Sequence, residues 1–154
     1  MVLHLFKWLG ETPVGFFMQQ STYAFAIVEM FHLLSLTILG GAILLIDLRL
    51  LGFGFKNQTA GQLAKELRRW LQGSLVIAAI SGILLLAEEP IKCYYSPAFR
   101  LKMFLLILAV LFYFGVQDRI FARDGKRALE RTAGIVSLAL WFGVALSGRA
   151  IGLL

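Results

Sequence analysis

The sequence has little of what a disulfide, a cysteine-bound metal or a large soluble surface requires. It contains 1 cysteine, Cys93, 2 histidines and 3 prolines in 154 residues. A lone cysteine excludes a disulfide within the chain and a cysteine-rich zinc or iron–sulfur site. Charged residues make up only 16% of the chain, whereas 59% of its residues are hydrophobic. A soluble domain of this length needs more polar surface, so the composition indicates a membrane protein.

Acidic residues are also few, with 9 Asp and Glu against 15 Lys and Arg. The basic residues gather between apolar runs rather than along one face, a distribution typical of charges that flank membrane spans. We therefore expect the lipid bilayer as the partner and no nucleic acid. The segment from Met1 to Leu9 is too short for the apolar core of a signal peptide, so we expect the N-terminus to be retained.

Four apolar runs set the expected fold. They cover about residues 22–46, 70–87, 99–116 and 132–152, each near the ~20 residues that cross ~30 Å of hydrocarbon. Residues 2–12 predict an interfacial helix that ends before Pro13, and Thr59 predicts the N-cap of an amphipathic lead-in to the second span. The sequence predicts an all-α membrane protein: one domain over residues 1–154, an up-down bundle of four transmembrane helices with an N-terminal interfacial helix.

The distribution of basic residues predicts the orientation. Those on the connections after the first and third spans are Arg49, Lys56, Lys65, Arg68, Arg69, Arg119, Arg123, Lys126, Arg127 and Arg131. The opposite side has Lys7, Lys92, Arg100, Lys102 and Arg149. The positive-inside rule therefore predicts a bacterial inner membrane with both termini in the periplasm.

Two ionisable residues, Glu29 and His32, lie inside the first apolar run. Counted at 1.5 Å per residue from Thr22, they are roughly 10 to 15 Å below the outer surface. Ionisable groups at such depth are rare and usually functional. A spacing of three residues puts both on one helix face, so one ligand can touch both. Di-iron bundles use the same spacing but need a second copy, which this chain lacks.

Lys102 and Arg149 are predicted in the same leaflet, near the outer ends of the third and fourth spans. A bundle would bring them toward Glu29 and His32. The alternative without a ligand is that Arg149 pairs with Glu29, Lys102 reaches the headgroups, and His32 bonds to a helix hydroxyl or carbonyl.

Haem b between the helices accounts for these residues in one site. A neutral imidazole binds the iron, small and apolar residues such as Gly40 and Gly82 enclose the porphyrin, and cations pair with the propionates. We predict a cofactor site of His32, Glu29, Lys102 and Arg149, with His32 as the metal ligand and no catalytic residue. The expected function is electron transfer or haem-linked redox sensing, with a redox partner or quinone.

The second axial ligand is open, because His4 belongs to the interfacial segment. Met30, Met103, Lys102, His32 of a second subunit, or no ligand are the alternatives, and a homo-oligomer is expected. A rival hypothesis makes Glu29 and His32 ligands of a copper or iron ion. A third makes the pair a proton relay. A structural or assembly subunit without cofactor is the remaining alternative.

Asp47 and Arg49 follow at the inner end of the first span. We interpret them as a local salt bridge that fixes the helix exit rather than as a catalytic pair, since charges that flank a membrane usually serve as anchors.

Several motifs together resemble a family of small bacterial four-helix inner-membrane proteins. They are Val28-Glu29-x-x-His32-Leu33-Leu34, Gly40-Gly41, Asp47-Leu48-Arg49-Leu50-Leu51-Gly52, Ser96-Pro97-Ala98-Phe99, Lys102-Met103, Leu140-Trp141 and Gly148-Arg149. The resemblance covers nearly the whole chain and implies a four-helix membrane fold and recurrence of Glu29, His32, Asp47, Arg49, Lys102 and Arg149. It implies no activity. Many relatives carry a further histidine where this chain has Phe112 to Gly115, and its absence favours a mixed-ligand site.

Overall fold

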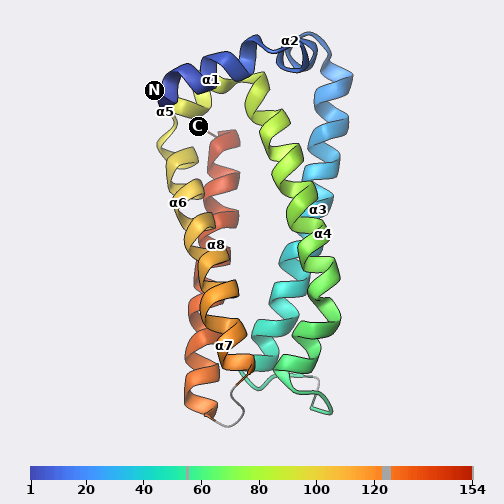
Figure 1. Ribbon diagram of the computed structural model, residues 1–154, viewed down its shortest axis with the longest axis vertical. Helices are drawn as coiled ribbons and strands as arrows, with labels where there is room; N and C mark the ends of the chain where they lie inside the picture. The colour runs from blue at the N-terminus through green and yellow to red at the C-terminus, as the bar shows by residue number, and fades with distance from the viewer. Residues whose placement is uncertain (55, 123–125, 154) are drawn as a thin grey trace.

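Long helices dominate the computed structural model, which describes residues 1–54, 56–122 and 126–153 (Figure 1). The elements are α1 (Val2–Glu11), α2 (Pro13–Gln20), α3 (Thr22–Leu50), α4 (Ala60–Glu88), α5 (Pro90–Tyr95), α6 (Pro97–Phe112), the π-helix η1 (Tyr113–Gln117), α7 (Asp118–Phe121) and α8 (Arg127–Leu153). Within the described residues, four stretches are long and apolar enough to cross a membrane: Thr22–Leu50, Ala60–Glu88, Pro97–Phe121 and Arg127–Leu153. The predicted all-α bundle of four membrane-spanning helices is confirmed.

Capping side chains explain where several helices begin. The backbone N–H of Gln62 donates to Thr59 Oγ1 at 3.2 Å, and the Thr59 N–H donates to Gln62 Oε1 at 3.1 Å, which forms a capping box. Such a cap satisfies amide groups that have no partner in the first helical turn. The predicted N-cap at Thr59 is confirmed. Because α4 begins at Ala60, the amphipathic lead-in and the second span are one helix of 29 residues.

Short helices cover the end of the bundle where both termini lie, which we call the termini end (Figure 1). The sequence predicted α1, but not α2 or α5, each of which begins with a proline. Proline suits the first helical position, where its missing N–H has no partner to lose. Gln19 Nε2 donates to the carbonyl oxygens of Gly10 and Ala87, at 3.2 and 3.1 Å, and so ties α2 to α1 and α4.

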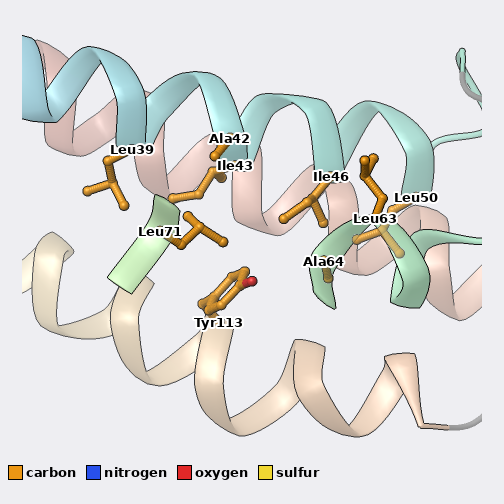
Figure 2. Close-up of a cluster of buried hydrophobic side chains, with 9 residues drawn as sticks. All are labelled: Leu39, Ala42, Ile43, Ile46, Leu50, Leu63, Ala64, Leu71 and Tyr113. Atoms are coloured by element: carbon orange, nitrogen blue, oxygen red, sulfur yellow. The ribbon is translucent and has the colours of Figure 1, made fainter. Parts of the chain in front are cut away.

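The four spans pack as two pairs, α3 against α4 and α6 against α8, and α3 against α8 joins the pairs. A cluster of buried side chains lies on the side away from the termini: Leu39, Ala42, Ile43, Ile46, Leu50, Leu63, Ala64, Leu71 and Tyr113 (Figure 2). We call it the core cluster. Its members come from the second half of α3, the first half of α4 and the start of η1. The core cluster therefore fills only the half of the bundle remote from the termini.

Glycine permits the closest approach between α3 and α8. A Cβ added at Gly134 would lie 3.1 Å from the carbonyl oxygen of Asp47 and 3.2 Å from Leu50 Cβ. A Cβ added at Gly40, which the sequence analysis expected to enclose a porphyrin, or at neighbouring Gly41 would have nothing within 4 Å. Their surface is therefore available to lipid or to a second copy of the chain, and not to a neighbouring helix of the same bundle.

The third span contains a π turn. The chain passes from α6 through η1 into α7, and the side chains of Tyr113 and Gln117 at the two ends of η1 are buried. π turns are rare and often occur at functional sites. Here the turn carries a polar amide, that of Gln117, into the interior of the bundle.

Candidate functional site

His32 lies between α3 and α4 in the half of the bundle nearest the termini. Its Nδ1 is 2.9 Å from Ser81 Oγ. A Cβ added at Gly82 would be 3.3 Å from His32 Cε1, so this glycine leaves room for the imidazole. The ring is half-buried, and it is tied to a hydroxyl of the neighbouring helix.

The hydrogen bonds of Ser81 favour one tautomer of the imidazole. Ser81 Oγ lies 2.6 Å from the Ile77 carbonyl oxygen and 3.3 Å from that of Ala78. A hydroxyl has one proton, and here it goes to a carbonyl of its own helix. Ser81 therefore accepts from His32 Nδ1–H. In the neutral ring, Nε2 then carries a lone pair, the arrangement that metal-bound histidines use.

Lys102 of α6 lies against Gly148 of α8 in the other helix pair, as His32 lies against Gly82 in the first. A Cβ added at Gly148 would lie 3.5 Å from Lys102 Nζ, so the lysine side chain of α6 lies across α8. Lys102 is partly buried and forms no hydrogen bond or ion pair with any residue that the structure describes. His32 and Lys102 thus lie on different helix pairs, which the packing of α3 against α8 joins.

Glu29 and Arg149 lie apart from this arrangement, because both side chains are exposed at the protein surface. Among the described residues, the one ion pair joins Lys92 to Glu89, at 2.8 Å. The suggested pairing of Arg149 with Glu29 is therefore not formed within the chain.

The other possible ligands of a metal are also dispersed. His4 is exposed on α1, and Met30 and Met103 are 57% and 39% exposed on the outer surfaces of α3 and α6. No group of three or more His, Cys, Asp and Glu side chains converges in the part of the chain that the structure describes. A closed site for a bare metal ion would need ligands from a second chain.

A second polar site lies in the other half of the bundle, where α3, η1 and α8 meet. Gln117 Nε2 donates to Asp47 Oδ1 at 3.0 Å, and Ser137 Oγ donates to Asp47 Oδ2 at 2.7 Å. Asp47 and Gln117 are fully buried, and Ser137 is 1% exposed. We call these three residues the Asp47 cluster. Asp47 is 15 residues from His32 on the same helix, roughly 22 Å at 1.5 Å per residue.

The interpretation of Asp47 and Arg49 as a local salt bridge is wrong. Arg49 Nε donates instead to the Gln58 carbonyl oxygen, at 2.5 Å, and holds the connection between α3 and α4. Asp47 points into the bundle because it lies one helical turn after Ile43 and next to Ile46, both of the core cluster. The helical periodicity of these apolar neighbours was the signal that placed Asp47 on the buried face.

One atom of the Asp47 cluster has no partner. Gln117 Oε1 is buried and forms no hydrogen bond with any described residue. Buried polar atoms are nearly always satisfied, so an exception calls for a ligand, a water or a change of protonation. The sequence indicated no role for Gln117 or Ser137, since a single amide and a single hydroxyl in apolar runs form no motif.

Comparison with known proteins identifies the family but no activity. No curated protein and no solved structure matches the chain. One family model does match, over residues 5–154, and it describes a family of unknown function, DUF6644. Because this match covers nearly the whole sequence, the chain belongs to the DUF6644 family.

Proposed function

We propose that the protein binds haem b in the membrane, with His32 as an axial ligand of the iron, and serves electron transfer or haem-linked redox sensing. The observation that carries the proposal is the hydrogen bond between His32 Nδ1 and Ser81 Oγ, 2.9 Å long, a bond that the alternative without a ligand also predicts. With the Ser81 proton on the Ile77 carbonyl, this bond favours the tautomer in which Nε2 has a lone pair. A histidine ligand of a metal usually donates its other ring N–H in this way.

The surroundings of His32 support a large apolar guest. The core cluster ends at Leu39 on α3 and at Leu71 on α4, so it does not extend to His32. Gly82 and Gly148 do not add to that space, because the imidazole and the Lys102 side chain occupy the room beside them. A porphyrin between the two helix pairs would replace lipid or water there with apolar contacts, and the Lys102 ammonium would pair with a propionate.

The described residues of one chain supply only half of the ligands that such a haem needs. They supply one imidazole nitrogen and one cation, whereas Glu29 and Arg149 are exposed and His4 lies on α1. Two chains that face one another would supply two copies of His32, which is why a homo-oligomer belongs to the proposal. Haem b would supply a one-electron couple when bound. His32, Ser81 and Lys102 would hold and orient it.

The orientation and the compartment belong to the same proposal. The connections that carry most of the basic residues lie at the end of the bundle opposite the termini (Figure 1). By the positive-inside rule, that end faces the cytoplasm of a bacterium, and both termini face the periplasm. The haem would then lie in the periplasmic half of the inner membrane, within reach of a quinone or a periplasmic redox partner.

Visible absorption of the detergent-purified protein, expressed with ample haem, tests the proposal. We expect a Soret band that His32→Ala abolishes and Glu130→Gln leaves unchanged, since Glu130 lies at the opposite end of the bundle. Absence of the band from the folded wild-type protein would overturn the proposal. Stoichiometric copper or iron without Soret absorption would establish the metal-ion alternative. Neither cofactor, with tolerance of His32→Leu and a co-purifying protein, would establish a structural or assembly subunit.

A further inference from the structure

We propose that Asp47 is a proton-binding carboxyl, which exchanges its proton with water at the end of the bundle opposite the termini. We call that end of the bundle the basic end, because its connections carry most of the basic residues. The Asp47 cluster lies in the half of the bundle that the haem proposal does not use. The proposal therefore stands or falls independently of the haem.

The charge of Asp47 has no counterion in the described part of the chain. Its two hydrogen bonds come from neutral groups, the Gln117 amide and the Ser137 hydroxyl. Arg49, two residues away, binds the Gln58 carbonyl instead. A carboxylate buried without a cation is unfavourable in a protein interior, and more so in a membrane. A small cation has to neutralise it, and the proton is the one that needs no additional space.

Gln117 gives the cluster a way to accept that proton. With Nε2 toward Asp47, the amide donates to the carboxylate at 3.0 Å. Rotated by 180° about its last bond, the same amide turns Oε1 toward Asp47 and accepts from the protonated carboxyl. The two orientations place heavy atoms in the same positions, so no helix has to move. The amide atom of Gln117 that faces away from Asp47 then needs only one water molecule as its hydrogen-bond partner.

Ser137 is equally adaptable, because a hydroxyl both donates and accepts. It donates to the carboxylate at 2.7 Å in the structure, and it can accept from a protonated carboxyl and donate to a carbonyl of its own helix. Both neighbours of Asp47 thus support the charged and the neutral form.

A polar pocket lies at the basic end of the bundle. Its volume is about 100 Å³, and its lining includes Arg49, Thr59, Ile120 and Glu130. Such a volume accommodates several water molecules. No member of the Asp47 cluster lines this pocket, but its lining residue Ile120 lies three residues after Gln117, where η1 passes into α7.

The opposite side of the cluster is closed. Ile43, Tyr113 and Trp141, each four residues from a member of the cluster, line an apolar cavity of only about 10 Å³. Leu39 and Leu71 of the core cluster complete its wall (Figure 2). Water that reaches Asp47 therefore comes from the basic end and not from the side of His32.

Other titratable groups surround the cluster on each neighbouring element, but none bonds to Asp47 in the described structure. Tyr113 of η1 belongs to the core cluster, four residues before Gln117, and the nearest charged residues of α4 and α7 to consider are Arg68 and Asp118. On α8, the pocket residue Glu130 is seven residues before Ser137. Asp118→Asn and Glu130→Gln are therefore the controls for any titration assigned to Asp47.

Infrared spectroscopy of the full chain in lipid nanodiscs tests the proposal. We expect the carbonyl stretch of a protonated buried carboxyl that disappears as the pH rises and shifts in D₂O. Asp47→Asn should remove it, and Asp118→Asn and Glu130→Gln should retain it. The proposal is overturned if Asp47→Asn retains the whole band, if no such band exists at any pH where the protein is folded, or if Na⁺ rather than pH displaces it.

A second variant keeps the test valid should Asp47→Asn fail to fold. Ser137→Ala retains the carboxyl but removes a donor that stabilises its charged form, so the band should disappear at higher pH than in the wild type. An unchanged midpoint would contradict the assignment to Asp47. Ala60→Leu fills part of the pocket at the basic end and should slow the shift in D₂O at least several-fold, whereas an unchanged rate would refute access from that end.

Discussion

The Ser137 hydroxyl of α8 donates to Asp47 Oδ2 of α3 at 2.7 Å, in the interior of the bundle. The bond crosses the contact that joins the two helix pairs. Directly beside it, Gly134 lets α8 approach the Asp47 carbonyl. A polar interaction and a close backbone contact thus hold the two pairs together in the half away from the termini.

Removal of the Ser137 hydroxyl should destabilise the protein. At a pH where Asp47 has lost its proton, Ser137→Ala leaves a buried carboxylate oxygen without its donor, and hydrogen bonds to charged groups contribute about 1.5–3 kcal/mol. We expect a loss of this size in the free energy of unfolding, measured by reversible denaturant unfolding in mixed micelles.

Ser147→Ala is the matched control for that experiment. Ser147 is also buried on α8, but its hydroxyl donates only to the Gly143 and Val144 carbonyls of its own helix. Its removal should cost less than 1 kcal/mol, because the carbonyls keep their helical partners. Equal losses for the two variants would show that the bond to Asp47 contributes nothing specific.

Ser81→Ala tests the role of the serine in positioning His32. Without the acceptor, the imidazole loses the bond that fixes its tautomer, and outer partners of this kind typically account for 10- to 100-fold in affinity. We expect haem affinity, titrated by Soret absorption, to fall by about that factor. Ser74→Ala is the control, since Ser74 is buried on the same helix and donates only to the Leu71 carbonyl. A fall of equal size in both variants would mean that general packing, not the His32 bond, decides affinity.

The apolar runs were sufficient to predict the four spans because length and hydropathy alone determine whether a helix can cross a membrane. They did not predict α2 and α5. Those short helices depend on Pro13 and Pro90 as first residues and on tertiary bonds such as that of Gln19 to Ala87. A weak local preference for helix is sufficient only when a neighbouring helix supplies such tertiary bonds.

The candidate site was predictable in part for a similar reason. An ionisable residue in hydrocarbon stands out in any sequence, so His32 and Lys102 could be named. Gly82 was named as a small residue beside a cofactor, but its contact with the His32 imidazole and the bond from His32 to Ser81 depend on α4 lying beside α3. Gln117 and Ser137 escaped notice because only the fold brings them to Asp47, across 70 and 90 residues of chain.

Gly134→Ala tests the close contact between α3 and α8. Its Cβ would lie 3.1 Å from a backbone oxygen and 3.2 Å from Leu50 Cβ, neither of which can move easily. Overpacking of this kind typically costs 1–3 kcal/mol, roughly. Gly41→Ala adds the same methyl group where nothing lies within 4 Å, so its midpoint of thermal unfolding should not fall. A Gly134→Ala variant as stable as the wild type would show that the helices separate freely here.

Cys93 provides a test of the orientation without any added cysteine. It lies on α5 at the termini end and is partly exposed. Burial raises the pKa of its thiol, and the charge of Glu89 raises it further. Only the thiolate reacts with a maleimide, so labelling should be slow at neutral pH and should still accelerate above the ordinary thiol pKa of about 8.5.

A membrane-impermeant maleimide should therefore label Cys93 in intact cells with a permeable outer membrane, and faster at pH 9 than at pH 7. In a Cys93→Ser background, Asn57→Cys places the thiol on the exposed connection after α3, where the same reagent should react only after the inner membrane is disrupted. The opposite pattern would put both termini in the cytoplasm. It would also move the polar pocket at the basic end to the periplasmic side, because this pocket and the termini lie at opposite ends of the same helices.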